Sequence, residues 1–355
     1  MPDVLQHCFG SPSTGGPATA LARFLEHAGR SYPTMWQPGP AGGLSVGLIR
    51  DFMRQIRAQR PRLIHVRGLG NEGFHAALAA RLAGVPQVLV SIHGSHRDLQ
   101  QPRSRLRRAI VAHGLEPATL SLATAIVTVC DYAARRDFLQ RHRAKLLPPV
   151  PNGVPLPALD RPRRAAVRAE LGVGDDRIVA VCVSRLTPEK GYGDLAAALA
   201  RLDGLDVPLD LVVVGGGDDD GSIRALFAGL RHIGVHFVGH QSDVTPFLEA
   251  ADLFVFPTWS ENLSNALLEA MSYALPVVTT QVGGNTEVIA KGGGILVPSH
   301  DPERLAAAIR ELIGDPGRMR ALGHAARANV ERHYSITAMV EGWERTYALL
   351  LERRA

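Results

Sequence analysis

Short apolar segments alternate with longer amphipathic segments along nearly the whole chain, and this alternation restricts the fold more than any other feature. Short apolar runs are typical of buried strands, and the amphipathic stretches between them are typical of helices. The apolar runs are residues 4–8, 63–66, 87–92, 125–129, 178–183, 211–214, 235–238, 253–256 and 276–279. Because strands that alternate with helices form parallel sheets, the pattern predicts an α/β fold.

A proline-rich segment at residues 147–157 divides the strands into two comparable sets. Proline interrupts helices and central strands, so this segment is the predicted domain boundary. We predict two doubly wound, Rossmann-like domains, at residues 1–152 and 153–334, that face each other across a cleft. A chain of 355 residues with 46% hydrophobic composition is long enough for two such cores. The amphipathic run at 336–353 predicts a last helix, within residues 335–355, that packs back on the N-terminal domain.

The bulk composition narrows the class of protein. A net charge of +5 is compatible with nucleic acid, anionic lipid or an anionic substrate. Because aromatic residues make up only 5% and are rare in the arginine runs, we expect no nucleic-acid partner. The scattered Cys8, Cys130 and Cys182 are expected to be buried, reduced thiols. The first residues lack the pattern of a signal peptide and no run is long enough to span a membrane, so we expect a cytoplasmic protein.

Two carboxylates flank a predicted helix start. Glu261 follows the apolar run 253–256, and Glu269 lies within the helix-forming stretch 266–274, which Ser264 is suited to cap. The unpaired amides of a helix N-terminus between the two carboxylates form an anion site. This order matches a nucleotide sugar, with its sugar hydroxyls, its diphosphate and its ribose hydroxyls.

Two cations follow the predicted strand 178–183. Arg185 and Lys190 lie five residues apart beside Gly191, and a helix is expected to begin near Tyr192. A planar guanidinium and a compact ammonium at a strand end form a plausible diphosphate clamp. Solvated surface charge is the alternative interpretation of the same two residues.

Two features of the N-terminal half point to the same edge of a sheet. Gly15 and Gly16 follow the first strand, and adjacent glycines let a backbone approach a phosphate or a sugar closely. His93 directly follows the strand 87–92 and can donate a hydrogen bond to a sugar hydroxyl or to a departing phosphate. A plain tight turn and a structural histidine remain open as alternatives.

Together these motifs resemble the retaining glycosyltransferases of family 4, the glycosyl transferases group 1, which have the GT-B fold. In the C-terminal half the resemblance rests on motifs in the order typical of that family. They are Ser184-Arg185-Leu186, Glu189-Lys190-Gly191, Val214-Gly215, Val238-Gly239, residues 252–257, Glu261 with Glu269, Pro276-Val277-Val278, and Val282-Gly283-Gly284 with Glu287. The N-terminal half agrees more loosely, through Thr14-Gly15-Gly16, His65-Val66-Arg67-Gly68, His93-Gly94 and Pro151-Asn152-Gly153-Val154.

The resemblance implies a role for each candidate residue. Arg185 and Lys190 hold the donor diphosphate, Glu269 the ribose, and Glu261 a hydroxyl of the transferred sugar. His93 contacts the sugar near the reacting centre. The remaining donor contacts come from the backbone of Gly15, Gly16, Leu263, Ser264 and Asn265. His93, Glu261, Arg185 and Lys190 are the expected catalytic group. The sequence departs from the family at two places. Asn262 stands where the family often has glycine, and Gly217 is a third consecutive glycine that is followed by a run of aspartates.

The implied reaction is transfer of a sugar from a nucleoside diphosphate sugar, UDP-sugar being favoured over GDP-sugar, to an acceptor hydroxyl with retained configuration. The resemblance implies no metal and no other cofactor. The acceptor is either lipid-linked or soluble, because the basic residues Arg97, Arg103, Arg105, Arg107 and Arg108 fit either a helix on the inner face of a membrane or a solvated surface. A nucleotide-sugar epimerase or hydrolase with the same fold and no separate acceptor is the alternative function.

Overall fold

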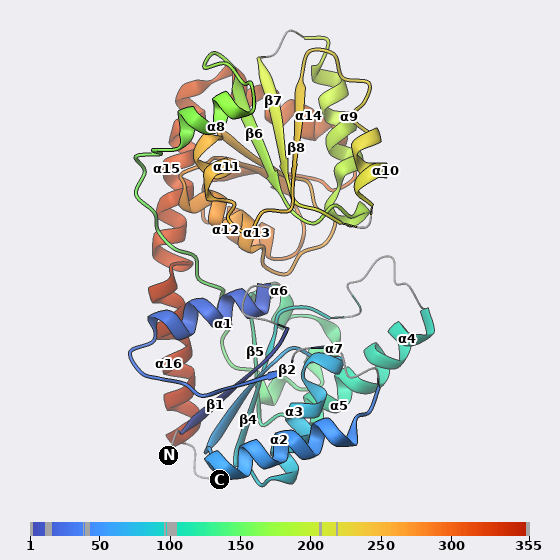
Figure 1. Cartoon of the computed structure of the whole chain (residues 1–355), viewed down its shortest axis with the longest axis vertical. Helices are drawn as coiled ribbons and strands as arrows, with labels where there is room; N and C mark the ends of the chain where they lie inside the picture. Colours follow the sequence, from blue (N-terminus) through green and yellow to red (C-terminus); the bar gives the residue numbers. More distant parts are fainter. Residues whose placement is uncertain are drawn as a thin grey trace. The chain divides into compact units, whose positions relative to one another are not determined.

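The computed structural model describes residues 3–10, 16–37, 39, 43–95, 97, 105–205, 208–217 and 219–352. The chain forms two compact units (Figure 1). Unit 1 comprises Met1–Gly153 together with Ile336–Ala355, and unit 2 comprises Val154–Ser335. The chain therefore passes from unit 1 to unit 2 inside the proline-rich segment, and its last helix returns to unit 1.

Unit 1 is built on a parallel sheet of five strands in the order β2-β1-β3-β4-β5. The strands are β1 (Val4–Phe9), β2 (Thr34–Gln37), β3 (Leu63–Arg67), β4 (Gln87–Ile92) and β5 (Ala125–Thr128). Strand β2 pairs with one side of β1, and β3, β4 and β5 then follow on the other side. This is the doubly wound arrangement that was predicted.

Helices cover both faces of this sheet. One face packs on α2, α3 and α5, and the other on α1 and α16. The elements of unit 1 are α1 (Gly16–His27), α2 (Val46–Gln59), η1 (Gly70–Glu72), α3 (Phe74–Leu82), α4 (Arg105–Ile110), η3 (Val111–Leu115), α5 (Glu116–Leu122), α6 (Asp131–Ala134), α7 (Asp137–Gln140), η4 (Arg143–Lys145) and α16 (Ile336–Glu352).

Unit 2 is built on a parallel sheet of six strands in the order β11-β10-β9-β6-β7-β8. Its strands are β6 (Ile178–Val183), β7 (Leu209–Val214), β8 (Gly234–Gly239), β9 (Leu253–Phe256), β10 (Val277–Thr280) and β11 (Gly294–Val297). Strand β6 lies between β7 and β9, so the loops that follow these three strands meet at one edge.

The helices of unit 2 also lie on both faces of its sheet (Figure 1). Helices α9 and α14 share one core with β6, β7 and β9. The elements are α8 (Arg164–Glu170), η5 (Pro188–Lys190), α9 (Tyr192–Leu202), α10 (Asp220–Ala225), α11 (Thr245–Ala250), α12 (Asn265–Ser272), α13 (Gly283–Ile289), α14 (Pro302–Gly314) and α15 (Pro316–His333).

The sequence pattern missed two strands, and both lie at sheet edges. Strand β2 is a four-residue segment with a polar residue at each end, Thr34 and Gln37. Strand β11 follows the glycines at 292 and 293 and itself begins with Gly294, a composition typical of a loop. The other two edge strands, β5 and β8, contain apolar runs and were predicted, so the short polar or glycine-rich composition of β2 and β11 explains why they were missed.

Helix α16 completes the core of unit 1. Its apolar residues Met339, Trp343 and Tyr347 recur at helical spacing, and each is less than 5% exposed. They pack with Val4 of β1 and Leu63 of β3. The aromatic ring of Tyr347 also lies near those of Phe24 and Tyr32.

We predict that Trp343→Ala destabilises unit 1, because it removes a buried indole from the contact between α16 and the sheet. The expected loss in the free energy of opening is about 3–5 kcal/mol, measured by hydrogen exchange of the β1 and β3 amides. Leu349→Ala on the same helix is the control, since Leu349 is 42% exposed. Equal protection of these amides in the two variants would contradict the packing role.

Candidate functional site

The carboxyl end of β6 is held by close backbone contacts with the next loop. A Cβ atom on Gly215 would lie 1.8 Å from the carbonyl oxygen of Ser184, and one on Gly217 would lie 2.5 Å from that of Leu186. The Ser184 hydroxyl is hydrogen-bonded to the Tyr192 hydroxyl at 2.8 Å. The glycines therefore let the loop after β7 lie directly against the segment that carries Arg185.

A second close contact joins the loop after β6 to the loop after β9. Gly191 adopts a φ of +75°, and a Cβ there would lie 1.9 Å from the carbonyl oxygen of Pro257. The Glu189 carbonyl accepts hydrogen bonds from the Trp259 amide at 2.9 Å and from the Thr258 hydroxyl at 3.2 Å. Only glycine meets both the backbone angle and the space at position 191.

This contact brings two predicted site residues together. The Lys190 ammonium lies 2.8 Å from a carboxylate oxygen of Glu261, and their side chains are 12% and 20% exposed. The same ammonium lies 5.4 Å from the ring centroid of Phe256, the last residue of β9. The sequence placed Lys190 and Glu261 in one site but did not predict that they form an ion pair.

Arg185 lies beside this pair in sequence but is far more exposed. Its guanidinium is 3.9 Å from the Glu189 carboxylate, with 71% of the Arg185 side chain exposed. Exposed pairs of this kind contribute about 0–1 kcal/mol. Arg185 is therefore held weakly and is available to an anion.

The predicted helix start after Glu261 is confirmed. Ser264 is the N-cap of α12, and its hydroxyl accepts a hydrogen bond from the Leu267 amide at 3.2 Å. Leu263 and Ser264 lie in the preceding loop, Asn265 begins the helix, and Glu269 is a partly exposed residue on it. The first amides of α12 lack partners within the helix, so this N-terminus attracts anions.

A cluster that the sequence analysis missed stabilises the same loop. The Trp259 indole donates a hydrogen bond to the Asp194 carboxylate at 2.7 Å, and the His300 amide donates to that carboxylate at 3.2 Å. The rings of Trp259 and His300 lie 4.4 Å apart. The one signal in the sequence is a tryptophan two residues before Glu261 in a chain that has only three tryptophans.

In unit 1, His93 lies just after β4, as predicted, and is partly buried. Its Nε2 atom is 3.4 Å from the Ser91 hydroxyl. Burial, together with the nearby Arg67 guanidinium, lowers the pKa of His93 to about 3. The imidazole is therefore neutral at pH 7. Gly16 is the first residue of α1, and Gly15 lies outside the described residues.

Neither interpretation left open for the basic segment, a membrane-surface helix or a solvated surface, describes Arg97. Helix α4 begins at Arg105, and the Arg97 guanidinium pairs with the buried Glu116 carboxylate and lies 4.6 Å from the Phe138 ring centroid. A buried carboxylate draws this arginine inward because an unpaired buried charge is costly. Arg103 and the side chains of Arg105 and Arg107 lie outside the described residues, and Arg108 belongs to α4.

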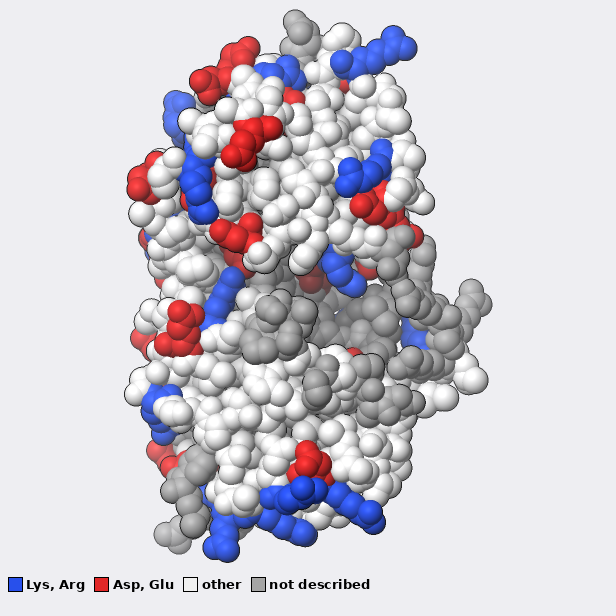
Figure 2. All heavy atoms as spheres, viewed as in Figure 1, with Lys and Arg blue, Asp and Glu red and all other residues white. Residues whose placement is uncertain are grey.

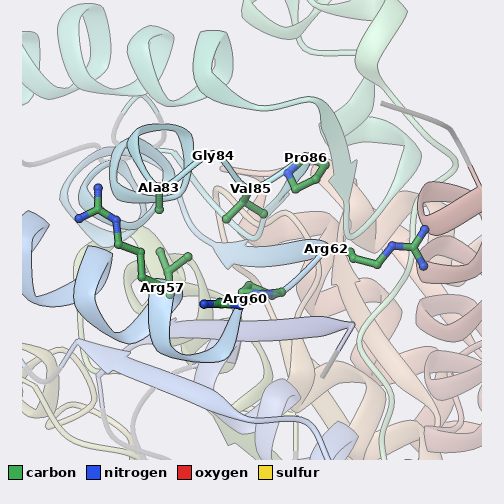
Figure 3. Close-up of a pocket in the computed structure, with 9 residues that line it drawn as sticks. Arg57, Arg60, Arg62, Ala83, Gly84, Val85 and Pro86 are labelled. Atoms are coloured by element: carbon green, nitrogen blue, oxygen red, sulfur yellow. The ribbon is translucent and has the colours of Figure 1, made fainter. Parts of the chain in front are cut away.

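A pocket of about 560 Å³ lies at the opposite edge of the unit 1 sheet, before the start of β3 and β4. Its lining includes the exposed Arg57, Arg60 and Arg62. Figure 3 shows that these three side chains point in different directions. Because ligands of doubly wound domains bind beyond the carboxyl ends of strands, this pocket is not where a donor is expected.

The face shown in Figure 2 is mixed in charge: Lys and Arg are interspersed with Asp and Glu, and a group of basic side chains lies at the lower end of the view. Within the described part of the chain, no cluster of three His, Cys, Asp or Glu side chains is placed to bind a metal ion, and no helix is long and apolar enough to cross a membrane. Cys8, Cys130 and Cys182 are buried thiols that form no disulfide within the described residues, as predicted.

Comparison with known proteins identifies both halves of the chain. Residues 177–315 match the family model described as glycosyl transferases group 1, and residues 4–153 match a glycosyl transferase 4-like domain. Alpha-maltose-1-phosphate synthase of Mycolicibacterium smegmatis is 30% identical over 365 aligned positions, which cover 96% of this chain and 89% of that protein. A GDP-mannose-dependent monoacylated alpha-(1-6)-phosphatidylinositol monomannoside mannosyltransferase of Corynebacterium glutamicum is 29% identical and covers 79% of this chain and 76% of its own.

Solved structures confirm the predicted GT-B fold. The sucrose-phosphate synthase of Thermosynechococcus elongatus has a TM-score of 0.75 at 21% identity and covers 99% of both chains. Anabaena HepE in complex with UDP has a TM-score of 0.75 at 19% identity and covers 98% of this chain and all of its own.

We predict that Gly191→Ala destabilises unit 2 by about 2 kcal/mol or more, because alanine at φ +75° is strained and its methyl group overlaps the Pro257 carbonyl. Denaturant unfolding measures the loss. Gly193→Ala is the matched control: nothing lies within 4 Å of its Cβ position, and it is helical. That variant should be about 0.5–1 kcal/mol more stable than the parent. Equal stability of the two variants would contradict the contact.

Proposed function

The chain belongs to the glycosyl transferases group 1 family, and from this premise we propose that it transfers a sugar from a nucleoside diphosphate sugar to an acceptor hydroxyl with retained anomeric configuration. The observation that carries the proposal is the position of Lys190 and Arg185 at the end of β6, where Lys190 is paired with the loop that leads into α12. Two cations and a helix N-terminus suit the diphosphate of such a donor.

Lys190 is proposed to bind the diphosphate without leaving Glu261. An ammonium group has three N–H donors, and the structure uses one of them for the Glu261 carboxylate at 2.8 Å. The other donors are suited to phosphate oxygens. Glu261 thus fixes the direction of the Lys190 side chain and keeps its second oxygen for a hydroxyl of the transferred sugar.

Glu269 is proposed to bind the ribose hydroxyls, because it lies on α12 beyond the helix N-terminus. Glu261 precedes that N-terminus and Glu269 follows it, which reproduces the order of sugar, diphosphate and ribose along the donor. A UDP-sugar is the first donor to test, since the similar HepE structure holds UDP, and GDP-mannose is the second, since the mannosyltransferase relative is named for it.

The proposed step breaks the bond between the sugar C1 and the diphosphate oxygen and forms a bond from C1 to the acceptor oxygen on the same face. The proton of the acceptor hydroxyl passes to the departing diphosphate. Arg185, Lys190 and the α12 N-terminus counter the charge that grows on that group, so no metal is required. His93, neutral at pH 7, is proposed to donate a hydrogen bond to the sugar.

The acceptor is proposed to be lipid-linked or soluble, in the synthesis of a bacterial glycolipid, polysaccharide or glycosylated natural product. Leu106 and Ile110 of α4 are 72% and 57% exposed, which suits contact with a membrane surface when the acceptor is a lipid. The proposed location is the cytoplasm, with contact at the inner face of the membrane in that case.

We predict that Lys190→Ala lowers kcat by about 100-fold or more, because it removes a cation from the developing charge. Arg185→Ala is expected to act in the same direction, whereas Glu269→Ala is expected mainly to raise the KM for the donor. Release of the nucleoside diphosphate measures turnover, and circular dichroism checks the fold. Arg201→Ala on an exposed face of α9 is the control. Full turnover by the Lys190→Ala protein would refute the clamp.

We also predict that a chelator such as EDTA leaves the rate of transfer unchanged, since the clamp supplies the positive charge that a divalent cation supplies elsewhere. The rate is compared before and after exhaustive treatment, and again after magnesium is added. Activity that disappears with the chelator and returns with magnesium would contradict the proposed metal-free step.

A further inference from the structure

Arg67 is a buried cation whose hydrogen-bond and ring contacts are with neutral groups. It is the last residue of β3, and only 3% of it is exposed. Its guanidinium donates a hydrogen bond to the Gln6 side-chain oxygen at 2.7 Å and lies 5.9 Å from the ring centroid of Trp343. Within the described part of the chain, no carboxylate pairs with it. Because arginine stays protonated, the charge itself is buried.

Elsewhere this chain neutralises an arginine that it buries. Arg168, 2% exposed, lies 3.2 Å from the Asp252 carboxylate, and it also donates to the Gly174 carbonyl at 2.8 Å. Arg97, whose side chain is 21% exposed, pairs with the Glu116 carboxylate. A buried charge is costly without a partner. Arg67 thus differs from the structural arginines in that its contacts among the described residues are with neutral groups.

The neutral neighbours hold Arg67 in one place. The Gln6 side chain, which accepts from Arg67, donates to the Tyr347 hydroxyl at 3.1 Å. That hydroxyl lies 2.7 Å from His65 Nδ1. Tyr347 and Trp343 both come from α16, the helix that returns from the far end of the chain. A guanidinium held in this way needs little reordering to bind a ligand.

The surroundings suit an anion with attached hydroxyl groups. The Tyr347 hydroxyl is closer to His65 Nδ1 than to the Gln6 oxygen, at 2.7 Å against 3.4 Å, which favours donation to the histidine. His65 Nε2 then carries the proton, and it is buried without a hydrogen-bond partner. Arg67 also lies close enough to His93 to lower its pKa. Arg67 pairs in register with Ser91 of β4, and the Ser91 hydroxyl lies 3.4 Å from His93 Nε2, so the partly exposed His93 follows directly after the strand residue that lies beside Arg67.

We propose that Arg67 binds an anionic group of the acceptor, a phosphate, which supplies the charge that the protein does not, while His65 Nε2 donates a hydrogen bond beside it. This inference rests on the proposed function, because it makes the substrate of the same transferase a phosphorylated acceptor. A planar guanidinium binds phosphate through two parallel hydrogen bonds. The phosphate is either that of a soluble sugar phosphate or that of a phospholipid headgroup.

Calorimetry with matched probes tests the site, with saturating UDP present to occupy the clamp of unit 2. Glucose 1-phosphate is compared with glucose, and vesicles of phosphatidylcholine with phosphatidylinositol are compared with phosphatidylcholine alone. The wild-type protein is expected to prefer a phosphorylated probe by about tenfold or more. Arg67→Gln should remove that preference and leave the affinity for UDP unchanged. Preference for glucose 1-phosphate indicates a soluble acceptor, and preference for the phosphatidylinositol vesicles indicates a lipid.

Arg57→Gln is the matched control, since Arg57 is an exposed cation of the pocket at the opposite edge of the sheet (Figure 3). It should bind the phosphorylated probes as the wild type does. Loss of binding in Arg57→Gln alone, wild-type binding in Arg67→Gln, or no preference for any phosphorylated probe would each overturn the inference. If Arg67→Gln does not fold, Arg67→Lys replaces it: weaker binding is expected without the planar fork, and wild-type binding would again overturn the site.

The two proposals fail separately. A protein that binds glucose 1-phosphate through Arg67 and transfers sugar from no donor contradicts the proposed function alone. A folded Arg67→Gln protein that transfers sugar to a phosphorylated acceptor at the wild-type rate and KM contradicts this inference alone.

Discussion

The candidate site of unit 2 depends on the close approach of two strand-end loops. Strands β6 and β9 are paired in the sheet, so their carboxyl ends lie side by side, and Gly191 lets the loops after them touch backbone to backbone at Pro257. That contact places Lys190 within 2.8 Å of Glu261. Gly215 allows the same approach on the β7 side, against Ser184. The charged side chains are thus positioned by backbone contacts that no larger residue permits, which gives a site with little freedom to relax.

The cations of unit 2 fall into two groups, those whose charge is neutralised inside the protein and those that can still bind an anion. Arg168 lies 3.2 Å from the Asp252 carboxylate and donates to carbonyl groups, so its charge is neutralised inside unit 2. Lys190 is different because its one carboxylate partner leaves further donors, and Arg185 is different because its partner at 3.9 Å is weak. A cation that keeps unused hydrogen-bond donors on an exposed or partly exposed side chain retains affinity for an anion. Whether a cation can bind an anion therefore depends on its partners in the folded protein and not on its position in the sequence.

The sequence predicted the features that depend on neighbouring residues and missed those that depend on distant ones. Central strands such as β4 and β6 were predicted because burial on both faces requires a continuous apolar run. The Ser264 cap was predicted because it acts within one helical turn. The edge strands β2 and β11 were missed, and so was the contact of Trp259 with Asp194, 65 residues away. The interpretation of Arg97 failed for the same reason, because its partner Glu116 belongs to another element.

Helix α16 shows how one element serves both stability and the site. Its residues at successive turns enter the core of unit 1, and two of them, Trp343 and Tyr347, also border the polar cluster around Arg67. A buried polar cluster is tolerated only where its geometry is fixed, since a small displacement leaves groups unpaired at high cost. The apolar contacts of α16 provide that rigidity, because they position the Tyr347 hydroxyl between Gln6 and His65. Helix α16 therefore contributes to the core of unit 1 and also orders the hydrogen bonds that hold the buried Arg67 cation at the end of β3.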